Sequence, residues 1–158
     1  MLAPASGPTG YNCVFIEVSS PYGELSYFRA MILSCLYIDE SEGRGKGVFT
    51  REPLEPDTIV EVSPVVVMTP EERKLLDLTR LHDYIFEWNP GGETACCMAQ
   101  GYISVYNHSY ASNCEYFMNY EEETIMIKTV REIAAGEELT INYNGDWNDE
   151  KPVWFATV

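Results

Sequence analysis

The residues that could do chemistry in this chain gather in three short segments. The first is Asn107-His108-Ser109 followed by Asn113-Cys114, which puts amide, imidazole, hydroxyl and thiol groups directly after the apolar run Ile103–Tyr106. Functional residues concentrate where a strand enters a loop. This segment is a candidate site, although a histidine in such a place is more often a buried imidazole bonded to backbone than a catalytic group.

A cysteine hydrolase would pair His108 with Cys114. The thiolate is the nucleophile in such enzymes, and it forms beside positive charge or at the start of a helix. Neither setting is evident around Cys114, and no third group is evident that would orient the histidine. The hydrolase is therefore the weaker alternative for this segment.

The second segment, Gly43-Arg44-Gly45-Lys46-Gly47, is rich in glycine. No Lys-Ser or Lys-Thr pair and no helical pattern follow it, which argues against a Walker-type phosphate loop. Glycine lacks a Cβ and accepts positive φ, so the backbone here could pass close to a ligand. A tight hairpin turn would explain the same glycines.

The third segment, Gly136 to Tyr143, predicts an acidic turn that runs into a short strand ending at a tyrosine. A tyrosine at a strand end most often packs, with its ring buried and its hydroxyl in water. Taken alone, the segment does not indicate a function.

The elements that must position these segments are mostly short strands. Apolar runs rich in Val, Ile, Thr and Tyr, separated by glycine, proline and acidic turns, predict a mostly β protein. The predicted strands are Leu33–Ile38, Gly47–Thr50, Thr58–Val62, Val65–Met68, Ile103–Tyr106, Glu115–Asn119, Thr124–Lys128 and Leu139–Asn142.

A single helix is predicted from Thr69 to about Leu81. Thr69 can cap it, Pro70 suits its first position, and Glu72 completes a capping box. Its predicted apolar contacts are Leu75, Leu76 and Leu78. One helix among many strands argues against a doubly wound α/β fold.

Length and charge limit the possible functions. The chain has 158 residues, 46% of them hydrophobic, which suffices for one compact domain. Its formal net charge of −15 would repel a phosphate backbone, so direct nucleic-acid binding is not expected. The same charge would attract a basic peptide, or would simply keep the surface solvated. No apolar run approaches the roughly 18 residues of a membrane span, and no secretory signal is evident.

The cysteines predict neither a metal site nor disulfides. There are five, and no CxxC motif occurs among them. The adjacent Cys96 and Cys97 cannot easily direct two thiolates at one metal. We expect reduced thiols, no bound metal and an intracellular protein, cytoplasmic or nuclear.

In their order and spacing the three segments resemble the SET-domain family. Its members have a Gly-x-Gly turn near the domain start, here Gly45-Lys46-Gly47, and an Asn-His-Ser/Cys segment followed by Asn, here Asn107 to Asn113. They also have a Gly-Glu-Glu-Leu-Thr-x-x-Tyr ending, here Gly136 to Tyr143. The resemblance covers most of the chain, from about Leu36 to Tyr143.

The resemblance implies a fold of several small β-sheets with a knot-like C-terminal threading, in which the segment ending at Tyr143 passes beneath a loop beside Asn107-His108. The expected domain is residues 33–143, with a short helical insert at about 69–101. Residues 1–32 would form a flank, and residues 144–158 a tail that completes the active site.

The resemblance also implies an enzyme, a protein-lysine methyltransferase that uses S-adenosyl-methionine and acts on a basic protein such as a histone. Tyr143 and Tyr116 would be catalytic. The cofactor would contact Gly45, Lys46, Gly47, Asn107, His108, Tyr143 and, in the tail, Trp154 or Phe155. The substrate channel would be lined by Tyr84, Tyr106, Tyr116 and Ile141.

This sequence departs from many family members in two ways. No tyrosine occurs around Val62-Ser63-Pro64, where several relatives have one, so Tyr84 or Tyr106 would have to form that wall. A cysteine-rich zinc module is also absent after Tyr143. The alternative to an active enzyme is a catalytically weak SET-like module that binds basic peptides.

Overall fold

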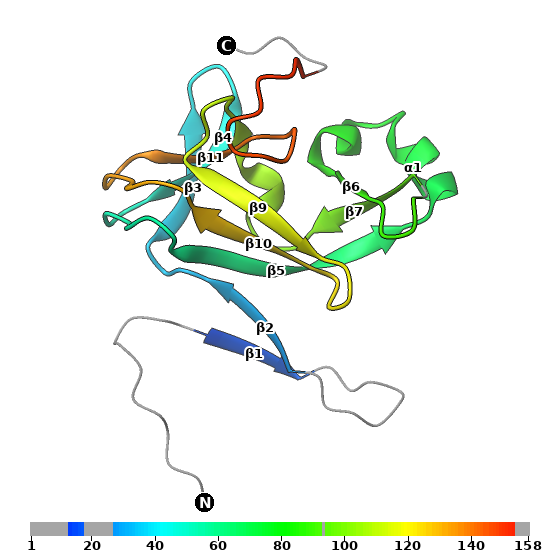
Figure 1. Cartoon of the computed structure of the whole chain (residues 1–158), viewed down its shortest axis with the longest axis horizontal. Coiled ribbons are helices and arrows are strands. Elements are labelled where there is room, and N and C mark those ends of the chain that lie inside the picture. The colour runs from blue at the N-terminus through cyan, green and yellow to red at the C-terminus, as the bar shows by residue number, and fades with distance from the viewer. Residues whose placement is uncertain (1–12, 18–26, 93, 154–158) are drawn as a thin grey trace, which may run out of the picture.

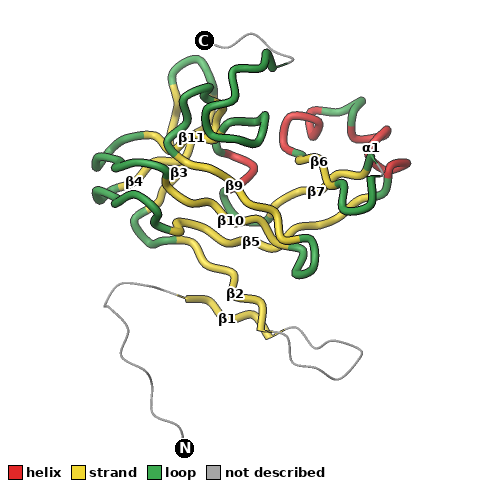
Figure 2. Tube along the Cα trace, in the orientation of Figure 1, coloured by secondary structure: helices red, strands yellow, loops and turns green. Residues whose placement is uncertain are grey.

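The computed structural model describes residues 13–17, 27–92 and 94–153. Strands and loops make up most of it, and helix is confined to the insert and to one short turn before β8 (Figure 2). The elements are β1 (Cys13–Glu17), β2 (Tyr27–Ile32), β3 (Leu36–Ser41), β4 (Gly45–Thr50), β5 (Ile59–Met68), α1 (Pro70–Leu76), η1 (Arg80–Tyr84), β6 (Phe86–Trp88), β7 (Ala95–Ala99), η2 (Ile103–Val105), β8 (Asn107–His108), β9 (Cys114–Asn119), β10 (Thr124–Thr129) and β11 (Glu138–Ile141). The prediction of a mostly β protein is confirmed.

The larger sheet has the strand order β1-β2-β5-β10-β9, and β7 and β6 extend it from the far end of β5 (Figure 1). β5 was predicted as two strands and is one. Its first half pairs with β2 and β10, and its second half, from Val65, pairs with β7. Pro64 lies where the partner changes, a position that tolerates a residue without an N–H.

The smaller sheet has the order β3-β4-β11-β8. β3 and β4 form a hairpin whose turn contains Gly43 and Gly45 at positive φ, so the hairpin reading of the glycine-rich segment is confirmed. β11 pairs antiparallel with β4 and parallel with β8, where Thr140 is opposite Asn107 and Ile141 is opposite His108. Segments far apart in the sequence thereby lie side by side.

The loop after β8 also holds the segment that follows β11. The Ser109 N–H donates to the Ile141 carbonyl at 3.0 Å, and the Ser112 N–H donates to the Trp147 carbonyl at 3.1 Å. The segment around Tyr143 therefore lies against the loop beside Asn107-His108, as the resemblance implied.

The core lies between the two sheets and is built from strand residues that alternate between buried and less buried positions. Its fully buried members include Val48, Ile125, Ile127, Leu139 and Ile141. β2 belongs to the region expected to be a flank, yet it pairs with β5 through Met31 and Ile32.

The insert begins as predicted and ends earlier. Thr69 and Glu72 form the capping box, and Pro70 begins α1. The helix stops at Leu76, not Leu81, because the Thr79 hydroxyl donates to the Leu76 carbonyl and accepts from the Leu81 N–H, which starts η1. The predicted apolar contacts were wrong for two of the leucines: Leu75 and Leu78 are 67% and 84% exposed. No described helix has the length and apolar content needed to cross a membrane.

One further strand prediction was wrong, and another began three residues too early. Ile103–Tyr106 was expected to be a strand, but Ile103–Val105 is the 3-10 turn η2. It follows Gly101, whose φ is +84°, and the N–H of Tyr102 is held by the side chain of Glu61. Leu33 to Cys35 form a turn, and β3 starts at Leu36.

Candidate active site

The glycine turn packs directly against the Asn-His segment and β11. A Cβ built on Gly47 would collide with the Glu138 carboxylate and lie 3.0 Å from the Asn107 amide nitrogen. Asn107 donates to the Lys46 carbonyl oxygen at 3.0 Å and to Glu138 Oε1 at 2.7 Å. Only glycine at position 47 allows these three segments to approach so closely.

Glu138, whose side chain is 13% exposed, joins the segments through its carboxylate. Besides Asn107, it accepts from Ser41 Oγ at 2.9 Å and pairs with Arg44 at 2.6 Å. Arg44 also donates to the His108 carbonyl at 3.4 Å. Sequence reasoning missed Glu138 and Arg44, although both lie inside the quoted motifs.

His108 supports Tyr143. The Tyr143 N–H donates to His108 Nδ1 at 3.1 Å, so Nδ1 is an acceptor and the ring is the neutral tautomer with its proton on Nε2. Burial lowers the pKa of His108, which favours the same neutral form. The His108 ring also packs on Tyr110 and Tyr143, with centroids 4.6 and 5.2 Å away.

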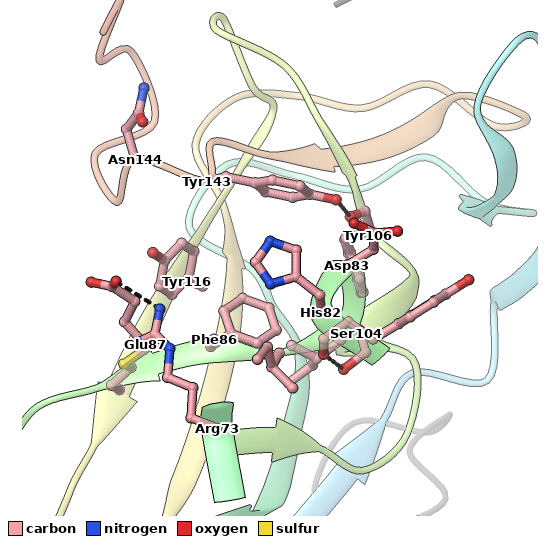
Figure 3. Close-up of a pocket in the computed structure, with 14 residues that line it drawn as sticks. Arg73, His82, Asp83, Phe86, Glu87, Ser104, Tyr106, Tyr116, Tyr143 and Asn144 are labelled. Atoms are coloured by element: carbon pink, nitrogen blue, oxygen red, sulfur yellow. Dashed lines mark hydrogen bonds and ion pairs between the residues drawn. The ribbon is translucent and has the colours of Figure 1, made fainter. Parts of the chain in front are cut away.

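On the other side of Tyr143 lies a cavity of about 480 Å³. The side chains of Tyr143, Tyr116, Phe86 and His82 surround it (Figure 3). The Tyr143 hydroxyl donates to the Tyr106 carbonyl oxygen at 2.8 Å. The Phe86 ring meets the Tyr116 ring edge-on at 5.5 Å. Four of the predicted site tyrosines, Tyr84, Tyr106, Tyr116 and Tyr143, line this one cavity.

The phenols of Tyr106, Tyr116 and Tyr143 stay protonated at neutral pH. Burial raises the pKa of Tyr116 and of Tyr143 to about 12. Burial also raises the pKa of Tyr106 well above its ordinary value, because its side chain is fully enclosed and lies beside Glu61. The walls are thus neutral aromatic surfaces, suited to holding a cation by cation–π attraction or an uncharged amine.

The insert supplies a polar rim of three residues, Asp83, Glu87 and Arg73, and Ser104 of η2 also lines the cavity. Arg73 pairs with Glu87 at 3.1 Å and donates to the Ala95 carbonyl at 3.3 Å, while Ser104 donates to the Tyr84 carbonyl at 2.9 Å. Nothing in the sequence marked these residues or Phe86, because tertiary packing of the insert brings them here.

The structure separates some predicted residues from the site. Ile141 is fully buried in the core and does not line the cavity. The Lys46 side chain pairs with Glu40 on the hairpin surface, so only its backbone faces Asn107. Trp154 and Phe155 lie outside the described residues. In the described part of the chain, no group of three or more His, Cys, Asp or Glu side chains could hold a metal ion.

Cys114 is not placed for nucleophilic chemistry. It is fully buried at the start of β9, and burial raises the pKa of its thiol. A cysteine nucleophile needs the opposite shift. The hydrolase alternative loses its support.

Two sheets define a SET-type domain here, the smaller one completed by the parallel pair of β11 with β8. A glycine turn lies on one side of the tyrosine that follows β11, and an aromatic cavity lies on its other side. The SET domain family model matches residues 45–144. The chain belongs to the SET-domain family.

The relatives agree with this assignment. The chain is 34% identical over 114 residues to the histone-lysine N-methyltransferase, H3 lysine-37 specific, of Schizosaccharomyces pombe, covering 72% of this chain and 76% of the relative. It is 27% identical over 150 residues to human histone-lysine N-methyltransferase 2D, covering 90% of this chain but 3% of that much longer protein. A solved Plasmodium falciparum structure assigned as a histone methyltransferase matches 73% of this chain and 98% of its own, with 28% identity and a TM-score of 0.56.

Proposed function

We propose that this protein transfers a methyl group from S-adenosyl-methionine to the side-chain amine of a lysine in a histone or similar basic protein. Its class, a protein-lysine methyltransferase, is that of its relatives. The observation that carries the proposal is the position of Tyr143. Its backbone N–H donates to His108, which follows the Asn107 that contacts Gly47. Its hydroxyl faces the aromatic cavity.

The Gly47 region fits a cofactor that needs close backbone approach. The residues that would hold S-adenosyl-methionine are the backbone of Gly45, Lys46 and Gly47, the side chain of Asn107 and the backbone of His108. Both Asn107 amide protons are committed, to Lys46 and Glu138, which leaves its carbonyl oxygen to accept from an ammonium group. When bound, the cofactor supplies a methyl group on a sulfonium centre.

The cavity would prepare the lysine. A free lysine has a pKa of about 10.4, so presenting its neutral amine near pH 7.4 costs about 4 kcal/mol unless the pKa falls. Enclosure by Tyr143, Tyr116 and Phe86 would desolvate the ammonium and lower its pKa. The remaining task is alignment of amine and methyl, which a fixed tyrosine hydroxyl can provide without a nucleophilic side chain.

Tyr143 and Tyr116 are the proposed catalytic residues. The Tyr143 hydroxyl commits its proton to the Tyr106 carbonyl, so its oxygen can only accept from the incoming amine. Tyr116 would hold the amine from the opposite wall, and Tyr84 and Tyr106 would complete the channel.

Charge supports a basic protein as partner. The chain carries a formal net charge of −15, and Asp83 and Glu87 lie on the rim of the cavity. Peptide affinity should fall as salt rises, because a Debye length of about 8 Å at physiological ionic strength screens long-range attraction. With histones as substrates, the enzyme would act in the nucleus.

One experiment tests the assignment. The protein is incubated with labelled S-adenosyl-methionine and core histones in the presence of a chelator, and modified residues are mapped by mass spectrometry. Lysine methylation by the native protein, with little by Tyr143→Phe, is the expected result. Cofactor and peptide binding by calorimetry without any transfer would instead identify a binding module.

A further inference from the structure

A carboxylate lies in the interior on the far side of Tyr106. Glu61, near the start of β5, is fully buried. Its Oε1 accepts from Ser63 Oγ at 2.8 Å and from the Tyr102 N–H at 2.8 Å. A buried carboxylate is expensive, because ions lose hydration that only hydrogen bonds or charges can replace. A group kept in such a place calls for a structural or functional reason.

Gly101 shows how tightly this carboxylate is enclosed. A Cβ at Gly101 would lie 2.5 Å from Glu61 Oε1 and 2.6 Å from Ser63 Oγ, and the Gly101 φ of +84° also favours glycine. The backbone therefore wraps directly over the carboxylate before it turns into η2. Glu61 and Ser63 fix the place where η2 begins.

η2 leads from Glu61 to the active site. Tyr106 ends this turn, with its N–H donating to the Ile103 carbonyl at 3.4 Å. The Tyr106 side chain is 1% exposed. Its hydroxyl and Glu61 Oε2 are both buried, and neither atom has a hydrogen-bond partner among the described residues. They lie close enough for each to influence the pKa of the other. The Tyr106 carbonyl oxygen accepts a hydrogen bond from the Tyr143 hydroxyl at 2.8 Å.

We propose that Glu61 is a positioning residue for methyl transfer. By holding the start of η2 and enclosing the Tyr106 ring, Glu61 fixes the carbonyl that orients the Tyr143 hydroxyl. Glu61 has no place in the cavity lining, so it acts only through Tyr106. This inference rests on the proposed function and adds Glu61 to the residues that serve it. Glu61 lies 41 positions before Tyr102, whose N–H it holds.

The test is Glu61→Gln, which keeps the size of the side chain and one acceptor oxygen but removes the charge. We expect kcat for a histone peptide, measured at about pH 8 where Glu61 is ionised, to fall about tenfold, the effect of weakening one charge-assisted hydrogen bond. The KM values for cofactor and peptide should change by less than about twofold, because neither ligand touches Glu61. A kcat equal to that of the native protein would overturn the proposal.

A double-mutant cycle separates positioning from general destabilisation. Without the Tyr143 hydroxyl there is nothing left for the Tyr106 carbonyl to orient. Glu61→Gln should therefore lower the rate by less than about twofold in a Tyr143→Phe background, measured with enzyme in excess of peptide. A full tenfold loss in that background would show that Glu61 acts elsewhere and would also overturn the proposal.

The matched control is Thr129→Val. Thr129 is fully buried in β10 of the same sheet, where its hydroxyl donates to the Glu55 carbonyl at 2.7 Å and accepts from the Thr58 N–H at 2.9 Å. The loss of these bonds should lower the melting temperature and leave kcat unchanged. Equal kcat losses in both variants would assign the effect to stability. A native protein that transfers no methyl at all would refute the proposed function and this inference with it, whereas a native kcat in Glu61→Gln would refute the inference alone.

Discussion

The hydroxyl of Tyr143 donates a 2.8 Å hydrogen bond to the backbone carbonyl oxygen of Tyr106. The same tyrosine gives its backbone N–H to the His108 ring. Both polar ends of the residue are therefore fixed by one stretch of chain, in which Tyr106 lies just before β8 and His108 ends it. A hydroxyl held in this way has one orientation before any substrate arrives, which is what an aligned displacement requires.

Replacing Tyr143 with phenylalanine should reduce kcat by about a hundredfold or more and change the Kd of S-adenosyl-methionine by less than about threefold. The lost hydroxyl acts on the amine in the cavity, whereas the backbone contact with His108 stays. Calorimetry and initial rates measure the two effects separately. Native turnover in the variant would show that Tyr143 is structural.

The native protein should add mainly one methyl group, and Tyr116→Phe should shift the product toward di-methylation. The Tyr116 hydroxyl lies in the cavity, where it would accept from the amine and hold a water in the space of a second methyl. Mass spectrometry of a single-lysine peptide measures the ratio. The control is Tyr120→Phe, because Tyr120 packs on Trp88 away from the cavity lining. Tri-methylation by the native enzyme, or an unchanged ratio in Tyr116→Phe, would contradict this prediction.

Gly47→Ala should weaken S-adenosyl-methionine binding by about tenfold or more. Its Cβ would push the Glu138 carboxylate and the Asn107 amide out of their contact. Gly91→Ala is the matched control, since a Cβ at Gly91 meets nothing within 4 Å. Equal cofactor affinities for the two variants would show that the glycine turn is not part of the cofactor site.

Gly101→Ala should destabilise the fold by about 2 kcal/mol more than Gly92→Ala. Both glycines have similar φ, +84° and +82°, so the backbone strain is alike. Only at Gly101 does the new Cβ meet other atoms, those of Glu61, Ser63 and Ile32. Urea denaturation gives the difference, and equal losses in the two variants would mean that the Glu61 pocket is looser than described.

The stability of the protein should depend on pH through Glu61. Burial raises the pKa of Glu61 to about 7, against an ordinary value of 4.5, while the hydrogen bonds from Ser63 and the Tyr102 N–H oppose the shift. The folded state therefore holds this proton more tightly than the unfolded state. The resulting stabilisation is complete below about pH 4.5 and is lost as pH rises through about 7.

Comparison with Glu61→Gln isolates that contribution, because the glutamine does not titrate. The free energy of unfolding of the native protein should fall relative to the variant by about 3 kcal/mol between pH 4.5 and 8. Urea denaturation at several pH values measures it. Parallel stability curves would mean that Glu61 ionises at its ordinary pKa.

Local signals predicted part of this fold. The start of α1 followed from Thr69, Pro70 and Glu72, because a capping box involves only neighbouring residues. The run Ile103–Tyr106 failed because its conformation is set by Gly101 and by Glu61, far away in the sequence. No local rule reveals that a strand carboxylate will accept a backbone N–H from another segment.

The candidate site divides in the same way. The motifs shared with the family predicted Tyr143, Asn107 and Gly47 as site residues. Phe86 and the acidic rim come from the insert, whose packing follows no motif. Ile141 was expected in the channel because the resemblance implied it and because it lies two residues before Tyr143, and residues two apart share one face of a strand. β11 ends at Ile141, so this rule does not extend to Tyr143, and Ile141 is fully buried in the core.

The parallel pairing of β11 with β8 also bears on when the site comes into existence during folding. Tyr143 meets a ring 35 positions earlier, and Glu138 meets Arg44 94 positions earlier. Such distant pairings close large loops and form late. A chain in which β11 has not yet docked holds neither the Glu138 contacts nor the Tyr143 hydroxyl in place. Cofactor should therefore bind the completed fold alone, and it should slow unfolding by holding that last strand against the rest.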